Sequence, residues 1–392
     1  MVLPRPGAGV AYSRGMPETH AARRQRLAVR IAESGADAAL VTHLVNVRYL
    51  TGLASSNAAL LVSAAGAGPG GGSAAVLATD SRYAPAAARD CADVELLTVR
   101  DVAGGLTGLA AARGLRRVLF EAHAMTVAKH AELGSANPEI ELAALGTAVE
   151  DLRVVKDAEE IAAIATACRL TCAAFDDVLP QVRPGVTEKQ LAIALERRMV
   201  ELGADEPGFA TIVASGPNGA IPHHVPTGRP IAEGDLVTMD LGARYGGYHA
   251  DMTRTVAVGE PASWQRDIYK LVAAAQQAGI DAAKPSAHVT AVDAAARDVI
   301  TSAGHGGHFG HGLGHGVGLE IHEAPLMHQD AAGTLGDRVP ITVEPGVYLP
   351  GMGGVRIEDT LVVRSGAGLA ASRDLLTTTQ TVPPGELLVL EP

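Results

Sequence analysis

Residues 240–251 read DLGARYGGYHAD, and this stretch decides how the carboxyl-terminal half of the chain folds. An apolar run leads into it, and Gly246 and Gly247 stand near its middle. Two glycines between runs of strand-forming residues are typical of a β-hairpin turn. Folding the chain back here predicts that Asp240 and Asp251 face each other on adjacent antiparallel strands, with Cβ atoms about 5 Å apart.

A second pair of acids brackets a similar glycine-rich stretch further along the chain. Residues 343–359 read VEPGVYLPGMGGVRIED, and we expect Glu344 and Glu358 to meet across another hairpin. Two such hairpins indicate two related halves. Carboxylates this close repel each other unless a proton or a cation lies between them. Four of them on one curved sheet predict a site for hard divalent cations, whereas two unrelated exposed turns remain the alternative.

Histidines and glycines fill the segment between the two hairpins, where residues 305–322 read HGGHFGHGLGHGVGLEIH. His311 and His315 have the spacing of zinc ligands on a helix, but the glycines between them disfavour a stable helix. A three-histidine zinc site therefore stays open as a weaker alternative. We interpret the glycines as backbone that passes close to a ligand or a metal ion. His223 and His224 precede the first aspartate strand, and histidines converging on four acids indicate a functional site.

The composition indicates a globular protein and excludes several classes of function. The chain has 32 Lys+Arg against 43 Asp+Glu, and this excess of acid argues against a nucleic-acid binder. No stretch approaches the ~20 apolar residues of a membrane helix, and the first residues lack the apolar core of a secretory signal. Three cysteines cannot close a disulfide framework. We therefore expect a cytoplasmic protein that contacts neither nucleic acid nor a membrane.

The length of 392 residues predicts two domains after a short extension. Residues 1–18 carry no interpretable signal and are compatible with disorder. Residues 19–152 alternate helical patterns with short apolar runs, which predicts an α/β domain. Asp157 and Glu160 form a capping-box pattern at the start of a second domain, residues 153–392, for which we expect an α+β fold with a curved antiparallel sheet. The apolar runs of the first domain are residues 38–42, 58–63, 75–78, 94–99 and 117–120.

Several segments, taken in order, resemble the proline-specific M24 metallopeptidases, aminopeptidase P and prolidase, which have the creatinase-like "pita-bread" fold. The resemblance rests on SGPNGAIPHH (215–224), GDLVTMD (234–240), GYHADMTRT (247–255), the histidine segment, EPGVY (344–348) and VRIED (355–359). NVRYLTG (46–52) and TDSRY (79–83) resemble the first domain of that family. The resemblance covers nearly the whole chain after the extension. It implies a creatinase-like α/β domain followed by a pita-bread catalytic domain.

The resemblance also implies a dinuclear metal centre with two divalent ions per chain, manganese in the first place and cobalt or zinc as substitutes. Its ligands fall on Asp240, Asp251, His315, Glu344 and Glu358. In such enzymes Asp251 and Glu358 bridge the two ions. The active-site residues of the family that are not ligands fall on His223, His311, His322 and Arg356.

The chemistry that the resemblance implies is the hydrolysis of an Xaa–Pro bond, a tertiary amide without an N–H group. We assign Glu344 as the base, and we expect His223 and a metal ion to stabilise the oxyanion. His322, with Arg356 nearby, protonates the departing proline nitrogen. Peptide binding is assigned to His223, His311 and His322.

Our main interpretation is an Xaa-Pro aminopeptidase acting on peptides with proline in second position. The first alternative is an Xaa-Pro dipeptidase, or prolidase, limited to dipeptides. A methionine aminopeptidase, a creatinase-like C–N hydrolase and a non-catalytic peptide-binding module on the same fold are more remote alternatives. The resemblance also implies a homodimer.

Overall fold

The structure is a computed structural model that describes residues 17–66, 74–366, 373–381 and 385–392. The chain divides into two compact units, Met1–Arg153 and Val154–Pro392. The boundary predicted from the sequence lies between residues 152 and 153. Residues 1–16 of the predicted extension lie outside the described residues, and helix α1 begins at Pro17. Among the helices that the structure describes, none combines the length and the apolar character needed to cross a membrane.

The first unit is built on a mixed sheet with the strand order β4-β3-β2-β1-β5-β6. Its strands are β1 (Ala38–Val41), β2 (Ala58–Ser63), β3 (Ala75–Thr79), β4 (Glu95–Thr98), β5 (Arg117–Phe120) and β6 (Glu141–Ala144). The five apolar runs of the sequence therefore correspond to β1–β5. The helices are α1 (Pro17–Glu33), α2 (Leu44–Thr51), α3 (Ala84–Asp90), α4 (Val102–Ala112), α5 (Val127–Ala136) and α6 (Ala148–Val154).

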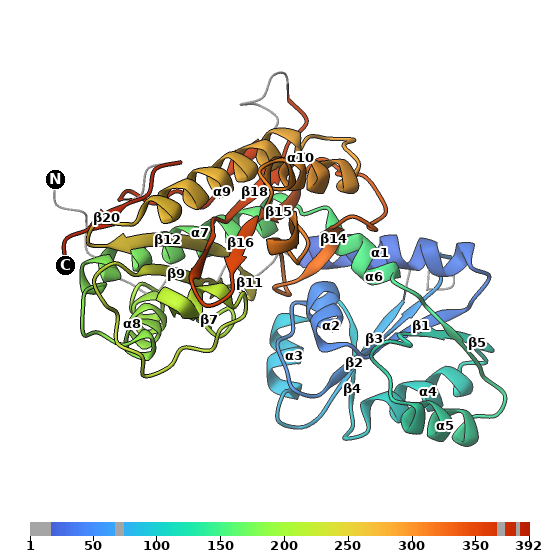
Figure 1. The fold of residues 1–392 in the computed structure, drawn as a ribbon. Helices are drawn as coiled ribbons and strands as arrows, with labels where there is room; N and C mark the ends of the chain where they lie inside the picture. Colours follow the sequence, from blue (N-terminus) through green and yellow to red (C-terminus); the bar gives the residue numbers. More distant parts are fainter. Residues whose placement is uncertain (1–16, 67–73, 367–372, 382–384) are drawn as a thin grey trace. The chain divides into compact units, whose positions relative to one another are not determined.

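Apolar side chains hold the layers of this unit together. Leu106 and Ala110 of α4 and Leu133 of α5 pack against the side chains of Leu40 and Leu61 in the sheet. Helix α1 covers the opposite face (Figure 1). The unit is thus an α/β sandwich whose core is aliphatic.

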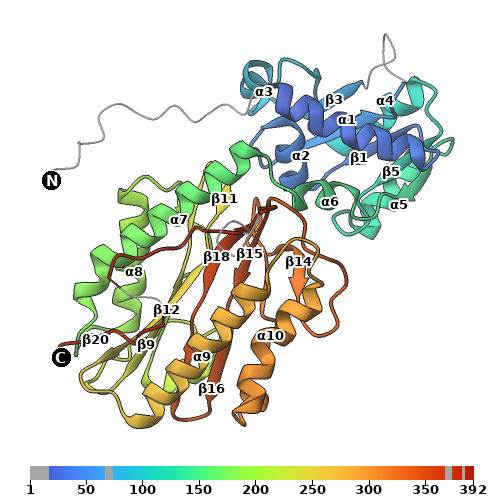
Figure 2. The same cartoon turned by 90° about the horizontal axis from the view of Figure 1, so that it is seen from above.

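The second unit consists of two halves with the same plan, a helix pair packed on a hairpin (Figure 2). Helices α7 (Ala158–Val178) and α8 (Glu188–Glu201) pack on β9 (Leu236–Leu241) and β12 (Met252–Val258). Helices α9 (Ser263–Ala282) and α10 (Val289–Ser302) pack on β15 (Val339–Val343) and β18 (Asp359–Val363). The two related halves inferred from the acid pairs therefore have a counterpart in the fold.

With its remaining strands the described part of this unit forms four sheets. Their strand orders are β20-β12-β9-β8, β14-β13-β15-β18-β19, β11-β10-β7 and β16-β17. They are β7 (Glu206–Pro207), β8 (Ile212–Ser215), β10 (Ala243–Tyr245), β11 (Tyr248–His249), β13 (Gly314–Gly316), β14 (Glu323–Met327), β16 (Gly346–Leu349), β17 (Gly353–Arg356), β19 (Arg373–Leu375) and β20 (Val389–Leu390). Most of these pairings are antiparallel, but β20 pairs with β12 in parallel.

The first acid-bracketed hairpin pairs in a different register from the predicted one. In the β9–β12 ladder, Asp240 lies opposite Thr253. The turn is the reason: Gly246 and Gly247 have φ of 60° and 88° and together form the two-residue loop, as a type I′ turn requires. The prediction that Asp240 lies directly opposite Asp251 is therefore wrong. Asp251 precedes Thr253 by two residues and is a diagonal neighbour of Asp240.

The second hairpin has the predicted geometry. Val343 at the end of β15 pairs with Asp359 at the start of β18, and the β16–β17 ladder continues the same register beyond them. Glu344 and Glu358 occupy opposite positions between these two ladders. The prediction that these two acids meet across a hairpin is confirmed.

The start of the second unit is anchored by a helix cap and by a buried ion pair. Asp157 accepts a hydrogen bond from the Glu160 amide while the Glu160 side chain accepts one from the Asp157 amide, so the predicted capping box is confirmed. The Lys156 ammonium donates to Glu323 Oε2 of β14 over 2.8 Å, and the two side chains are 1% and 4% exposed. This pair joins the chain entering α7 to the strand beside His315.

Replacing Lys156 with Met leaves the Glu323 carboxylate buried without its counter-charge. We expect the free energy of unfolding of the second unit to fall by about 3–5 kcal/mol, as is typical when one partner of a buried ion pair is removed. Urea unfolding followed by circular dichroism measures the loss. The double variant Lys156→Met/Glu323→Gln removes both charges and should recover much of it. Equal stabilities of the single and double variants would contradict this explanation.

Candidate metal centre

Of the five side chains predicted as metal ligands, four belong to the two hairpins and the fifth, His315, belongs to β13. Asp240 lies in β9, Asp251 just before β12, and His315 in β13, and all three are buried. Glu344 and Glu358 lie where β15 gives way to β16 and where β17 gives way to β18. His315 lies on a strand, so the expectation that the glycines disfavour a helix here is confirmed, and the weaker alternative of zinc ligands spaced on a helix does not hold.

Three of these side chains approach each other closely enough to share one ion. Asp251, His315 and Glu358 offer ligand atoms that all lie within 4.8 Å of one another. His315 Nε2 lies 3.6 Å from Asp251 Oδ2 and 3.4 Å from Glu344 Oε1. Asp240 lies near enough for its charge to act on Asp251 and Glu358. The structure therefore brings all five predicted ligands into one cluster.

Two carboxylates in the cluster have one oxygen bound and the other free. Asp240 Oδ2 accepts a hydrogen bond of 2.7 Å from Arg356, and Glu358 Oε2 accepts one of 2.7 Å from the Thr253 hydroxyl. Asp240 Oδ1 and Glu358 Oε1 are buried and have no hydrogen-bond partner among the described residues. Leaving such acceptors unsatisfied costs free energy that a bound cation would offset. The donor set thus fits hard divalent ions.

The His315 ring is oriented so that one nitrogen faces the acids. Its Nδ1 lies 3.0 Å from the carbonyl oxygen of Gly316, which can only accept, so Nδ1 carries the proton. In the neutral ring Nε2 then has a lone pair directed at Asp251 and Glu344. A backbone contact of this type commonly fixes the tautomer of a metal-binding histidine.

The electrostatics of the cluster reflect burial and crowding of like charges. Burial raises the pKa of Glu344 to about 8. Burial, together with the neighbouring carboxylates, also raises the pKa of Asp251 and of Glu358. All three acids are therefore hard to ionise together without a compensating positive charge.

The three histidines predicted to contact peptide lie around the same cluster. The His322 ring stands edge-on to His315 with centroids 4.4 Å apart, and His322 and His223 are both exposed. His311 Nε2 lies 2.9 Å from the Tyr348 hydroxyl. Burial lowers the pKa of both His311 and His322, and the nearby His223 adds to both shifts. The neighbouring His224 is buried, and its Nε2 lies 2.9 Å from Glu188 Oε2.

The Arg356 side chain forms hydrogen bonds with residues of both hairpins. Besides Asp240, the buried guanidinium donates to the Tyr348 hydroxyl over 3.0 Å, to the Thr253 hydroxyl over 3.0 Å and to the Pro222 carbonyl over 3.2 Å. These contacts show that Arg356 holds Asp240 in place. Thr253 and Tyr348 received no role from the sequence, although their spacings of two residues from Asp251 and four from Glu344 match strand alternation and were available as a signal.

The glycines of the histidine segment make room for neighbouring strands. A Cβ atom at Gly314 would lie 2.2 Å from the carbonyl oxygen of Thr342, and one at Gly316 would lie 2.3 Å from that of Ala324. The interpretation that these glycines bring backbone close to a ligand or a metal is therefore wrong at these two positions. The residues that these glycines allow to approach lie in β15, which carries Thr342, and in β14, which carries Ala324.

Glu188, in the first turn of α8, is another buried polar residue to which the sequence gave no role. Its two carboxylate oxygens accept hydrogen bonds from four residues of the segment that carries His223. The donors are the Ser215 amide and hydroxyl, the Asn218 amide, the His224 ring and the Thr227 amide and hydroxyl. Burial alone would raise the pKa of Glu188, but these hydrogen bonds outweigh it and lower the pKa to about 2.

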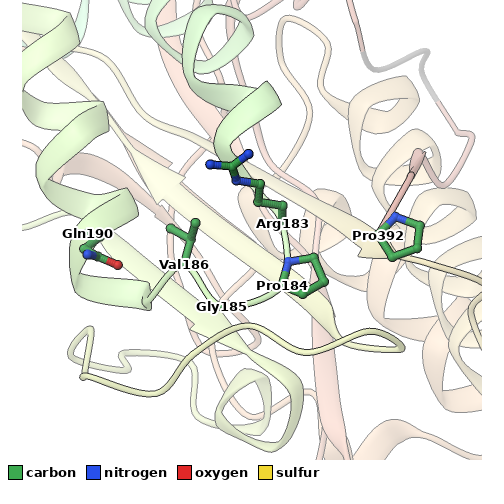
Figure 3. A pocket seen from close by; sticks show the side chains of 6 residues that line it. All are labelled: Arg183, Pro184, Gly185, Val186, Gln190 and Pro392. Atoms are coloured by element: carbon green, nitrogen blue, oxygen red, sulfur yellow. The ribbon is translucent and has the colours of Figure 1, made fainter.

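A separate surface hollow lies beside the start of α8 (Figure 3). Its lining consists of Arg183, Pro184, Gly185, Val186, Gln190 and Pro392. This lining offers neither an acid nor a histidine, so it does not compete with the carboxylate cluster as a catalytic site.

Comparisons with known proteins place the cluster in a wider context. The model of metallopeptidase family M24 matches residues 162–365, and that of the creatinase/prolidase N-terminal domain matches residues 23–155. The chain is 44% identical over 215 residues to the Xaa-Pro dipeptidase of Pyrococcus furiosus, a match covering 55% of this chain and 62% of that protein.

Two solved structures are similar over nearly their whole length. The Xaa-Pro dipeptidase from Bacillus anthracis has a TM-score of 0.87 at 34% identity, covering 95% of this chain and 100% of that one. The X-Pro aminopeptidase from Thermotoga maritima has a TM-score of 0.81 at 32% identity, covering 91% and 98%.

The Glu188 carboxylate predicts a specific dependence of stability on pH. A depressed pKa stabilises the fold above the ordinary value of about 4.5, and this contribution is lost as the pH falls toward 2. Between pH 6 and pH 3 the wild type should therefore lose about 2 kcal/mol of unfolding free energy more than Glu188→Gln does.

The matched control is Glu159→Gln, which removes an exposed acid from the first turn of α7. Urea unfolding at several pH values measures all three proteins. Parallel stability profiles for wild type and Glu188→Gln would contradict the role given to these hydrogen bonds.

Proposed function

Because the chain belongs to metallopeptidase family M24, we propose that it is an Xaa-Pro dipeptidase, a hydrolase that cleaves the bond between an amino-terminal residue and a following proline in a dipeptide. The observation that carries the proposal is the cluster of Asp251, His315 and Glu358, whose ligand atoms lie within 4.8 Å of one another. The relatives named as dipeptidases support the restriction to dipeptides.

The aminopeptidase activity favoured by the sequence alone becomes the second candidate. It keeps support from a structural neighbour named as an X-Pro aminopeptidase. The two activities differ in whether the site accepts residues beyond proline, so an assay on peptides of two lengths separates them.

Five side chains would hold two divalent ions: Asp240, Asp251, His315, Glu344 and Glu358. When bound, such ions act as Lewis acids that polarise the amide carbonyl and lower the pKa of water. The oxygen-rich donor set suits manganese, with cobalt or zinc as substitutes. Manganese as the resident metal, a homodimer and a cytosolic location all stay predictions.

The protein's own groups then divide the work of hydrolysis. The Glu344 carboxylate, whose Oε1 lies 3.4 Å from His315 Nε2, takes the proton of the attacking water. His223 is exposed beside the cluster and donates a hydrogen bond to the carbonyl oxygen as negative charge grows there. His322 delivers a proton to the departing proline nitrogen. Arg356 keeps Asp240 and Tyr348 fixed while this happens.

Peptide length provides the test of substrate class. With the manganese-loaded protein, we expect kcat/KM for Gly-Pro to exceed that for Gly-Pro-Ala at least about tenfold, equivalent to ~1.4 kcal/mol of transition-state stabilisation. Gly-Ala, which lacks proline, is the negative control. The opposite ratio would establish the aminopeptidase instead, and hydrolysis of none of these peptides by the metal-loaded protein would favour a binding module.

Glu358→Gln tests the metal centre without relying on turnover. Losing this ligand should weaken manganese binding by more than about 100-fold, beyond the 10–100-fold typical of changes around a ligand. The thermal midpoint of the wild type should rise on adding manganese, and that of the variant should stay nearly constant. Without metal, the variant should be at least as stable as the wild type, because one repelling charge is gone.

Glu233→Gln, an exposed acid in the same unit, is the control and should behave as wild type. Calorimetric titration and thermal unfolding provide both readouts. Wild-type manganese affinity in Glu358→Gln would rule out its role as a ligand.

A further inference from the structure

Two histidines follow neighbouring strands of the first unit. His43 lies shortly after the end of β1 and His123 shortly after the end of β5, and these two strands pair in parallel. Their carboxyl ends therefore meet at one edge of the sheet. The strand order also diverges here, because β2, β3 and β4 continue on one side of β1 while β5 and β6 lie on the other. Ligands of open α/β sheets bind outside the carboxyl ends of strands at such a switch point.

Glu150 of α6 joins the two histidines at this edge. The three side chains offer ligand atoms that all lie within 4.8 Å of one another. His123 Nε2 lies 3.1 Å from Glu150 Oε1, and the rings of His43 and His123 meet edge to face with centroids 5.9 Å apart. A tetrahedral zinc ion with bonds of ~2.0–2.1 Å separates its donors by roughly 3.3–3.4 Å, so small shifts of these side chains would accommodate one.

Hydrogen bonds from neighbouring residues fix the backbone at His43 and the side chain of Glu150. Glu121 is fully buried and accepts hydrogen bonds of 2.6 and 2.7 Å from the amides of Thr42 and His43, which fixes the backbone at His43. Asn46 donates to Glu150 Oε1 over 2.6 Å. Hydrogen bonds such as those made by Glu121 and Asn46 orient the ligands of metal sites. The other oxygen, Glu150 Oε2, is buried and has no hydrogen-bond partner among the described residues, so it is available to a metal ion.

We propose that His43, His123 and Glu150 form a second, mononuclear metal site that takes a borderline divalent cation, zinc in the first place. Two imidazoles and one carboxylate are donors that zinc prefers, whereas the carboxylate-rich centre of the second unit suits manganese. The His123 side chain is 46% exposed, so the ion is reachable from solvent and its fourth position is filled by water. The ion ties the ends of β1 and β5 to α6.

Zinc content of the full-length protein tests the proposal. After dialysis against zinc and removal of excess, wild type should retain one ion per chain more than His123→Ala or His43→Ala, as counted by mass spectrometry of the metal. The matched control is His130→Ala, which removes a histidine of α5 in the same unit and should keep the wild-type content. Dialysis against manganese should give equal contents in all four proteins, because the two-imidazole site binds manganese weakly.

Equal zinc contents in wild type and both cluster variants would overturn the proposal. A second measurement guards against a folding defect. Zinc should raise the thermal midpoint of the metal-centre variant Glu358→Gln, and adding His123→Ala should abolish most of that rise, while His123→Asp should restore part of it by supplying another ligand. If zinc raised the thermal midpoint of Glu358→Gln/His123→Ala as much as that of Glu358→Gln, the proposal would also be contradicted.

Discussion

The mutual repulsion of Asp240, Asp251, Glu344 and Glu358 is the constraint on which the second unit depends. Like charges brought together away from water cost free energy unless cations share them. Arg356 and Thr253 offset part of this cost, yet each binds only one oxygen of its carboxylate and leaves the other buried and free. The unit thus stores an unfavourable arrangement that becomes favourable when divalent ions bind.

The two-half plan explains how a single chain can bring these acids together. Asp251, Glu344 and Glu358 each lie where one ladder ends and the next begins, so their side chains are directed by the bends of the sheet. Each half is backed by its own helix pair and apolar core, which makes the bends rigid. Side chains that a rigid scaffold of strands and helices supports are held more precisely than side chains on loops.

Much of this architecture was readable from local patterns. The capping box of Asp157 and Glu160 and the opposition of Glu344 and Glu358 depend only on residues near in sequence, and both are confirmed. The creatinase-like domain followed by a pita-bread domain, expected from the resemblance, is confirmed by the family matches and the similar structures. The register of the first hairpin was misjudged because Gly246 and Gly247 are both used in the turn, and a shift of the turn by one residue moves the opposing partner by two.

By itself the sequence determined the residue types of the site, the order of its segments and the family to which the chain belongs, since these follow from spacing along one chain. Only the tertiary structure decided which partners those residues have. Glu188 binds His224 rather than His223, and Gly314 accommodates Thr342 rather than a ligand. His43, His123 and Glu150 meet although they are far apart in sequence. Such contacts depend on strand order and packing between distant segments, which no local pattern of residues encodes.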